Sequence, residues 1–294
     1  MGRRSMLAVM TVIVAACGGE GSSETTSTVT IPPSTTTPAV TEEAFPMGQP
    51  VDLVYISDSG GRHVAERYAE LAAEALDREV RLNRGVEADP AGIRTTFAAA
   101  VADAEIIVFY FNPGAFEEFM PEPNIRSGCF EAVDAYSGDP DYTGPPWTEG
   151  TRWEPVPVVP TASDWAPYRD WLGEVWDAIW EVRQGRPVVL RAHDIYNPWF
   201  AQLTELGVEP ECTAIWEGQT QAIRSAAEEH GAVFVSFFDL FNGPSHDEDP
   251  REKGWIGEDG MHANETGGAA AAEALAAVGF DLCEPPRQDG TPGT

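Results

Sequence analysis

Two short stretches near opposite ends of the chain hold residue types that together could cleave an acyl bond. The first is SDSGG, from Ser57 to Gly61, where an apolar run ends on hydroxyl groups and two glycines. The second is DGMH, from Asp259 to His262, which spaces a carboxylate and an imidazole three residues apart. Such a carboxylate can hold one imidazole nitrogen while the other takes a proton from a serine such as Ser59. The two stretches together predict nucleophilic serine chemistry.

The remaining histidines have other interpretations. His230 precedes Gly231 at the end of a helical pattern, which predicts a helix C-cap. His246 lies in a very acidic stretch that predicts a solvated loop. His63 is expected at a surface position of a helix, with lining the cleft as the alternative. His193 follows an apolar run, where lining a cleft and making a structural hydrogen bond both stay open.

The elements that must position these residues follow from alternating patterns. Strands are expected at Val51 to Ser57, Glu79 to Leu82, Glu105 to Phe111, Pro187 to Ala192 and Ala232 to Phe237. Helices are expected at Gly61 to Leu76, Pro90 to Ala102, Ser163 to Arg183, Thr213 to His230 and Glu265 to Ala277. Continuous apolar strands between helices are typical of a parallel sheet covered on both faces. The predicted fold is therefore α/β, a three-layer sandwich around a central parallel sheet of about five strands.

In such a sheet the ends of the first and third strands and the loop before the last helix lie on one rim. Here the sequence resembles the SGNH (GDSL) hydrolase superfamily. Ser57 to Gly60 is similar to its first block, with Ser in place of the leading Gly, and Asp259 to Asn264 is similar to its last. The resemblance spans roughly residues 50 to 280 and implies the flavodoxin-like SGNH hydrolase fold.

The resemblance also implies a catalytic role for three residues. Ser59 would be the nucleophile, His262 the general base and later the general acid, and Asp259 the group that orients the imidazole. Ser57 is the rival nucleophile, but it lies within the apolar register of the strand, so Ser59 is favoured. No metal or other cofactor is expected.

An oxyanion hole is implied as well. In the family it uses the N–H of the nucleophile, here Ser59, a glycine N–H after the second strand and an asparagine side chain after the third. Asn112 stands at the asparagine position, although the G-x-N-D of the family reads YFNP here; an ordinary turn asparagine is the alternative. The glycine position aligns with Ala88, and Gly85 is a nearby substitute, so both are retained.

The N-terminus has the layout of an export signal. Two arginines precede an apolar stretch and the sequence VAAC, which resembles a lipobox with Cys17 as the lipidated residue; an ordinary secretory signal is the alternative. The predicted organisation is a signal peptide at residues 1–16, a Ser/Thr/Pro/Gly-rich tether at 17–48, one hydrolase-like domain at 49–283 and a tail at 284–294. The expected location is outside the cytoplasm, lipid-anchored to the bacterial membrane.

Composition narrows the partners. A formal net charge of −30 repels nucleic acid and anionic headgroups, so nucleic-acid binding is not expected and membrane attachment would come through lipidated Cys17. An exported chain can keep a disulfide, but pairing among Cys129, Cys212 and Cys283 stays open, as does the alternative of three free thiols.

The stretch from residue 112 to residue 162 interrupts the alternation and predicts an irregular insertion at the ligand-binding rim. Its Trp147 and Trp153 could stack on sugars or pack against the sheet. The predicted activity is serine ester hydrolysis through an acyl-enzyme, with carbohydrate, cell-wall or small lipid esters as substrate. The alternatives are an inactive cell-envelope binding lipoprotein of the same fold and an O-acyltransferase.

Overall fold

The structure of the chain is a computed structural model that describes residues 48–57, 61–110, 126–137 and 147–286. The predicted signal peptide and tether, with Cys17, lie outside the described residues. So do Ser59 and Asn112.

Five parallel strands form one sheet in the order β2-β1-β3-β4-β5. The strands are β1 (Val51–Ile56), β2 (Val80–Asn83), β3 (Ile106–Phe109), β4 (Val189–His193) and β5 (Val233–Val235). All five lie where the apolar runs predicted them, and the predicted α/β class is confirmed. This strand order is the flavodoxin-like one, in which the direction of winding reverses between β1 and β3.

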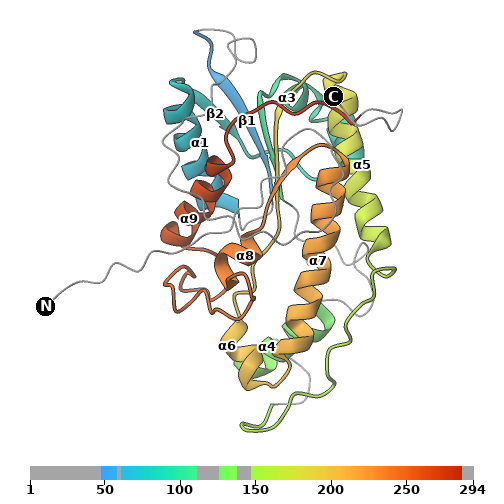
Figure 1. The fold of residues 1–294 in the computed structure, drawn as a ribbon, viewed down its shortest axis with the longest axis vertical. Coiled ribbons are helices and arrows are strands. Elements are labelled where there is room, and N and C mark those ends of the chain that lie inside the picture. The colour runs from blue at the N-terminus through green and yellow to red at the C-terminus, as the bar shows by residue number, and fades with distance from the viewer. Residues whose placement is uncertain (1–47, 58–60, 111–125, 138–146, 287–294) are drawn as a thin grey trace, which may run out of the picture.

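Both faces of the sheet are buried, and the side chains of each strand alternate between the two faces. In β1, Leu53 and Tyr55 belong to the core on one face, whereas Val54 and Ile56 belong to the core on the other. Figure 1 shows α1 and α9 covering the first face and α5 and α7 the second, which gives the three layers. These helices are α1 (Arg62–Leu76), α9 (Glu265–Ala277), α5 (Ala166–Arg183) and α7 (Glu209–Glu229).

Three helices differ from the expected boundaries. Helix α5 begins at Ala166, three residues after the predicted Ser163. The single helix predicted from Pro90 to Ala102 is two short helices, α2 (Pro90–Arg94) and α3 (Ala98–Asp103). Thr95 ends α2 with its hydroxyl donating to the Ala91 carbonyl 2.8 Å away, a local bond that competes with helix continuation. Helix α7 begins four residues before the predicted Thr213, because Pro210 stands in its first turn, where a missing N–H has no cost.

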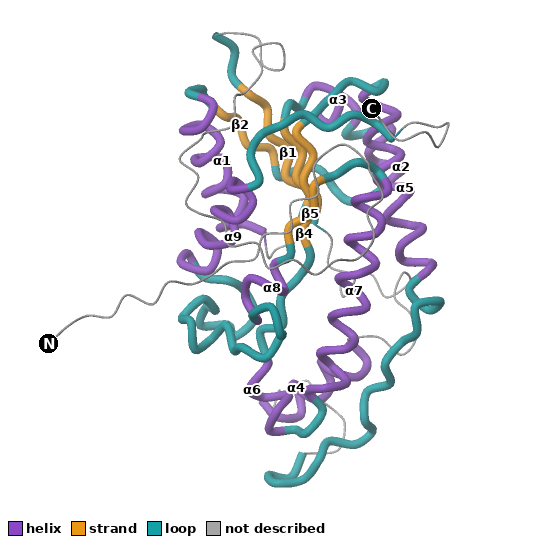
Figure 2. Tube along the Cα trace, in the orientation of Figure 1, coloured by secondary structure: helices purple, strands orange, loops and turns teal. Residues whose placement is uncertain are grey.

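Four short elements gather at the carboxyl ends of the strands, below the sheet in Figure 2. They are the π-helical turn η4 (Arg126–Phe130), α4 (Glu131–Ser137), α6 (Phe200–Glu205) and α8 (Phe237–Asn242). None was predicted, because an element of five to seven residues is too short to show helical periodicity. None of the described helices is long and apolar enough to cross a membrane.

A disulfide ties this lower end together. Cys129 in η4 is bonded to Cys212 in α7, 83 residues later. Cys283 is a buried free thiol. The structure therefore selects one of the pairings that the sequence left open and fixes the described part of the insertion to the second helical layer.

Candidate active site

The loop that carries the D-x-x-H stretch is closed by backbone bonds. Ile256 bridges to Ala263, and the Gly257 N–H donates to the His262 carbonyl over 2.8 Å. Gly260 has a φ of +71°, a left-handed conformation that side chains disfavour, so the turn requires glycine there. The loop thus returns the chain to α9 with Asp259 and His262 facing each other.

Asp259 and His262 form a directly bonded pair. Asp259 Oδ2 lies 2.8 Å from His262 Nδ1, and Asp259 Oδ1 accepts the Met261 and His262 N–H groups at 2.9 and 3.0 Å. The Met261 N–H, followed by the bonds from His262, holds the pKa of Asp259 at about 2. An ionised Asp259 needs a donor, so the proton of a neutral His262 sits on Nδ1 and the acceptor lone pair on Nε2. This is the arrangement a general base requires.

Three contacts hold the loop from outside. Arg251 donates to the Gly260 carbonyl over 2.7 Å, and the Tyr196 hydroxyl donates to the Met261 carbonyl over 3.2 Å. Asn264 caps α9 by accepting the Thr266 and Gly267 N–H groups. Arg251 and Tyr196 were not predicted as site residues, because no motif marks either of them and Tyr196 lies 65 residues before Met261.

Glycine lets α9 approach α1 closely. A Cβ on Gly268 would stand 2.6 Å from His63 Cβ, so no side chain fits there. This contact brings the loop before α9 next to the start of α1, which follows the SDSGG stretch. His63, expected on a helix surface, is half-buried at this contact.

The chain segments that hold Ser59 and Asn112 leave the sheet from neighbouring strands. Ile56 pairs with Phe109 in the parallel register, and the Tyr110 N–H donates to the Ile56 carbonyl over 2.8 Å. Ser59 lies three residues beyond Ile56 and Asn112 two residues beyond Tyr110, and both belong to the undescribed residues. Their catalytic assignments stay predictions.

Gly85 and Ala88 lie in the described loop after β2. The Gly85 N–H donates to the Asn83 side-chain oxygen over 2.9 Å. Ala88 is half-buried against the core and directly precedes Asp89, which caps α2. Since the Gly85 N–H already has an acceptor, the Ala88 N–H is the more available donor of the two, and the assignment stays a prediction.

A pocket opens beside the Asp259–His262 pair and holds about 660 Å³ of space, its mouth included. Its described lining comes from several segments at this end of the sheet and includes Gly61, Tyr110, Phe130, Tyr196, Phe237 and His262. The end of the SDSGG stretch and the end of the D-x-x-H stretch therefore line the same pocket.

His193 lies in this pocket as a fixed neutral ring, so both of its open interpretations hold. Its Nε2 is 2.7 Å from the Tyr55 hydroxyl and its Nδ1 2.9 Å from the Asp194 carbonyl. The ring stacks between Tyr110 and Phe237, with centroids 4.6 and 3.9 Å away. Burial lowers the pKa of His193 to about 3, so the ring carries a single proton and no charge at neutral pH.

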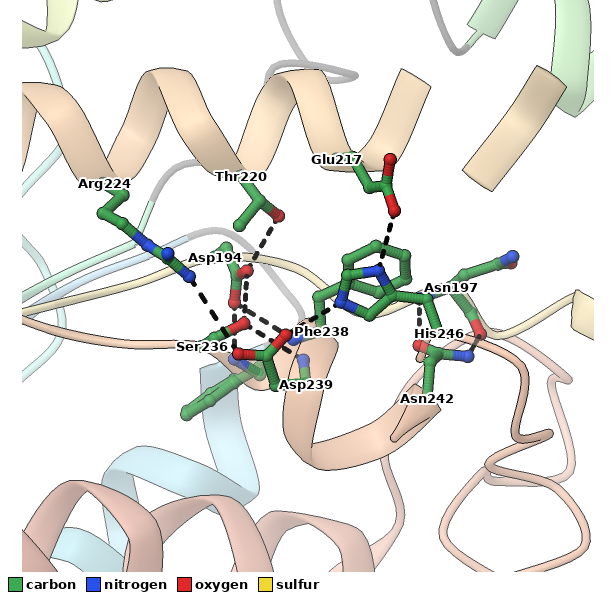
Figure 3. Close-up of polar contacts among 11 residues, drawn as sticks. Asp194, Asn197, Glu217, Thr220, Arg224, Ser236, Phe238, Asp239, Asn242 and His246 are labelled. Atoms are coloured by element: carbon green, nitrogen blue, oxygen red, sulfur yellow. Dashed lines mark hydrogen bonds and ion pairs between the residues drawn. The ribbon is translucent and has the colours of Figure 1, made fainter. Parts of the chain in front are cut away.

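Behind the pocket, the Asp194 carboxylate caps α8 (Figure 3). Its oxygens accept the Thr220 and Ser236 hydroxyls at 2.8 and 3.0 Å and the N–H groups of Phe237 and Phe238. Burial raises the pKa of Asp194 to about 6, against these hydrogen bonds, which lower it. Asp194 therefore fixes the helix that carries Phe237 into the pocket wall. Sequence reasoning missed this role because nothing in the sequence marks a long-range cap.

His246 contradicts the predicted solvated loop. Its Nε2 lies 2.8 Å from Asp239 Oδ1 and its Nδ1 3.1 Å from Glu217 Oε1, and its ring stacks on Phe238 (Figure 3). Burial lowers the pKa of His246, but the two carboxylates outweigh it, and the net shift is upward. We call His246, Asp239 and Glu217 the His246 cluster. His230, in contrast, is the C-cap of α7, as predicted.

The tryptophans of the insertion serve in packing. Trp153 is buried in the core, and its backbone N–H donates to the Leu206 carbonyl over 2.8 Å. Trp147 is half-buried, and its indole N–H donates to the Thr151 carbonyl over 2.8 Å. Over the described ranges, no group of three or more His, Cys, Asp or Glu residues could hold a metal ion.

Comparison with known proteins identifies no family for this chain. No family model and no curated protein matches the chain. Among solved structures it is similar to a salicylyl-acyltransferase from a tetracycline biosynthetic pathway, with 16% identity and a TM-score of 0.37. That match covers 80% of this chain and 56% of the other, so the chain spans little more than half of that protein's length. At this similarity no activity transfers from one protein to the other.

Proposed function

We propose that the protein is a serine ester hydrolase of SGNH type. The carrying observation is the Asp259–His262 pair, 2.8 Å apart, on the rim of a pocket that Gly61 also lines. Gly61 is two residues beyond Ser59, so the proposed nucleophile is attached to the pocket wall by a short stretch of chain. The neighbouring ends of β1 and β3 support the proposal that Asn112 belongs to the oxyanion hole of the same site.

The proposed reaction has two steps. Ser59 Oγ bonds to the ester carbonyl carbon while its proton passes to His262 Nε2, and the bond to the alcohol oxygen then breaks as His262 returns that proton to the alcohol. Water then attacks the acyl-enzyme, giving one proton to His262, and the released Ser59 takes it back. Asp259 stays ionised throughout and stabilises the imidazolium. Asn112 and the Ser59 and Ala88 N–H groups would stabilise the oxyanion.

Covalent labelling tests this assignment. We expect a fluorophosphonate probe to label the full-length protein, and Ser59→Ala to abolish labelling while Ser57→Ala retains it. Ser57→Ala is the matched control, since the two serines are two residues apart and only Ser59 is the proposed nucleophile. Labelling that persists in Ser59→Ala, or no labelling of the wild type, would contradict the proposal. In the second case, the inactive binding protein becomes the better interpretation.

We also propose an extracytoplasmic location with a lipid anchor at Cys17. The Cys129–Cys212 disulfide supports it, because such bonds persist in oxidising compartments. Cys17→Ala should abolish incorporation of labelled palmitate in a bacterial host and release the protein from the membrane fraction. Unchanged lipid labelling of Cys17→Ala would refute the anchor.

A further inference from the structure

The described lining of the pocket beside His262 presents ring faces and few polar atoms for a ligand. The two nitrogens of His193 face the Tyr55 hydroxyl and the Asp194 carbonyl. The Tyr196 hydroxyl donates to the Met261 carbonyl. A sugar ring in this pocket would lose hydrogen bonds to water without replacing them, which is costly, whereas an apolar group would gain by leaving water.

The Asp194 carboxylate is also committed, although Asp194 lines the pocket. Its two oxygens accept four donors, two hydroxyls and two backbone N–H groups. A carboxylate with four donors has its lone pairs filled. The buried charge therefore serves α8 and leaves the pocket apolar.

Stacked rings form two walls of the pocket. Tyr110, His193 and Phe237 form one stack, with interplanar angles of 8° and 20° between neighbours. Tyr196 and Phe241 form a second stack, with ring centroids 4.1 Å apart and an interplanar angle of 9°. His193 is held on both faces and each of the other rings on one, which restricts their rotation and gives the pocket a set shape before a ligand arrives.

The disulfide-bonded segment adds another part of the lining. Phe130 directly follows Cys129 and packs edge-on against Trp199, with centroids 4.8 Å apart. Both residues line the pocket. The disulfide thus fixes an aromatic side chain where it limits the space available to a ligand.

Proton transfer decides which half of an ester belongs in the pocket. His262 returns its proton to the leaving alcohol, so the alcohol must lie against the imidazole, whose side chain is 40% exposed. The alcohol then leaves toward solvent. The acyl group must stay through the second step, and among the described residues the pocket that reaches inward from His262 offers the space for it.

We infer that the pocket is the acyl site and that the substrates are esters of apolar carboxylic acids larger than acetic acid. This inference rests on the proposed function and narrows its substrate class. It favours small lipid esters and acylated polymers with apolar acyl groups over acetylated carbohydrates.

Two ester series test the inference on the full-length protein. In the first, p-nitrophenyl esters run from acetyl through butyryl and hexanoyl to octanoyl; in the second, acetate esters carry alcohols of the same lengths. We expect kcat/KM to rise roughly four-fold per added acyl methylene until the pocket is full, which is the gain from burying one CH₂. The alcohol series should vary less than about two-fold per methylene.

Three variants localise the effect. Ile195→Trp puts a large ring on the pocket lining and should lower the ratio of hexanoyl to acetyl kcat/KM by about ten-fold or more. Phe130→Ala widens the pocket and should move the preferred acyl group to a longer chain. Trp171→Ala is the control, since Trp171 is a half-buried aromatic residue of α5 outside the pocket lining, and it should leave the ratio unchanged. Thermal denaturation confirms that each variant is folded.

The possible failures are distinguishable. Acetyl esters preferred over all longer ones, or a length dependence that follows the alcohol, would overturn the acyl-site inference while leaving ester hydrolysis intact. A ratio unchanged in both folded pocket variants would also overturn it. No hydrolysis of any ester, together with no labelling at Ser59, would overturn the proposed function and this inference with it.

Discussion

Two histidine–carboxylate contacts in this molecule have the same length and different surroundings. His262 lies 2.8 Å from Asp259 on the pocket rim, and His246 lies 2.8 Å from Asp239 between α7 and α8. The His262 side chain is 40% exposed, whereas that of His246 is 16% exposed. Distance alone therefore does not separate a base from a structural ion pair.

The number of carboxylates separates them. His246 has a carboxylate on each ring nitrogen, which favours the doubly protonated ring, and a ring with two protons has no lone pair to accept another. His262 has one carboxylate on Nδ1, so its neutral form keeps an acceptor at Nε2. The same residue types thus favour a protonated ring between two helices in one place and give a candidate base in the other.

Replacing each histidine with glutamine should give the largest difference. We expect His262→Gln to lower kcat/KM on the best ester by about 10³-fold or more, because glutamine cannot accept and return the serine proton. His246→Gln should change it less than about three-fold, since His246 is absent from the pocket lining. Steady-state kinetics measures both. Equal losses in the two variants would show that His262 has no special role.

The free energy of unfolding should depend more on the buried carboxylate behind the pocket than on the carboxylate of the proposed catalytic pair. Asp194→Ala leaves the Phe237 and Phe238 N–H groups and two hydroxyls without their acceptor, and should lower the free energy of unfolding by about 2–4 kcal/mol. Asp259→Ala removes a carboxylate whose side chain is 53% exposed and should lower it by less than about 1 kcal/mol. Urea denaturation at pH 7.5 compares them. A larger loss for Asp259→Ala would contradict this division between site and scaffold.

The sequence predicted the sheet and the exposed pair, and the reason is local. Continuous apolar runs mark buried strands wherever they occur, and Asp259 and His262 are close enough in sequence for a turn to bring them together. The residues that support them are not local. Arg251 and Tyr196 reach the loop only after folding, and Asp194 caps a helix more than forty residues later. The prediction for His246 was wrong because its acidic neighbours in the sequence are typical of a solvated loop, whereas its partners Glu217 and Phe238 come close only in the fold.

The His246 cluster makes a small predicted contribution to stability, and pH isolates it. Because the pKa of His246 is raised in the fold above its usual 6.5, its stabilising contribution is complete below about pH 6.5 and is lost as pH rises through the folded value. A double-mutant cycle of His246→Gln and Asp239→Asn, measured by urea denaturation, should give a coupling of about 1 kcal/mol at pH 5.5 and less at pH 8.5.

The cycle also removes other influences on each residue. Arg224 lies 4.0 Å from Asp239, and its contribution cancels because it is present in all four proteins. Glu217→Gln in place of Asp239→Asn is the matched second cycle and should give a smaller coupling, since the Glu217 side chain is 54% exposed. A coupling that does not change with pH would mean that His246 is held by stacking on Phe238 and not by charge. The contrast with His262 would then rest on burial alone.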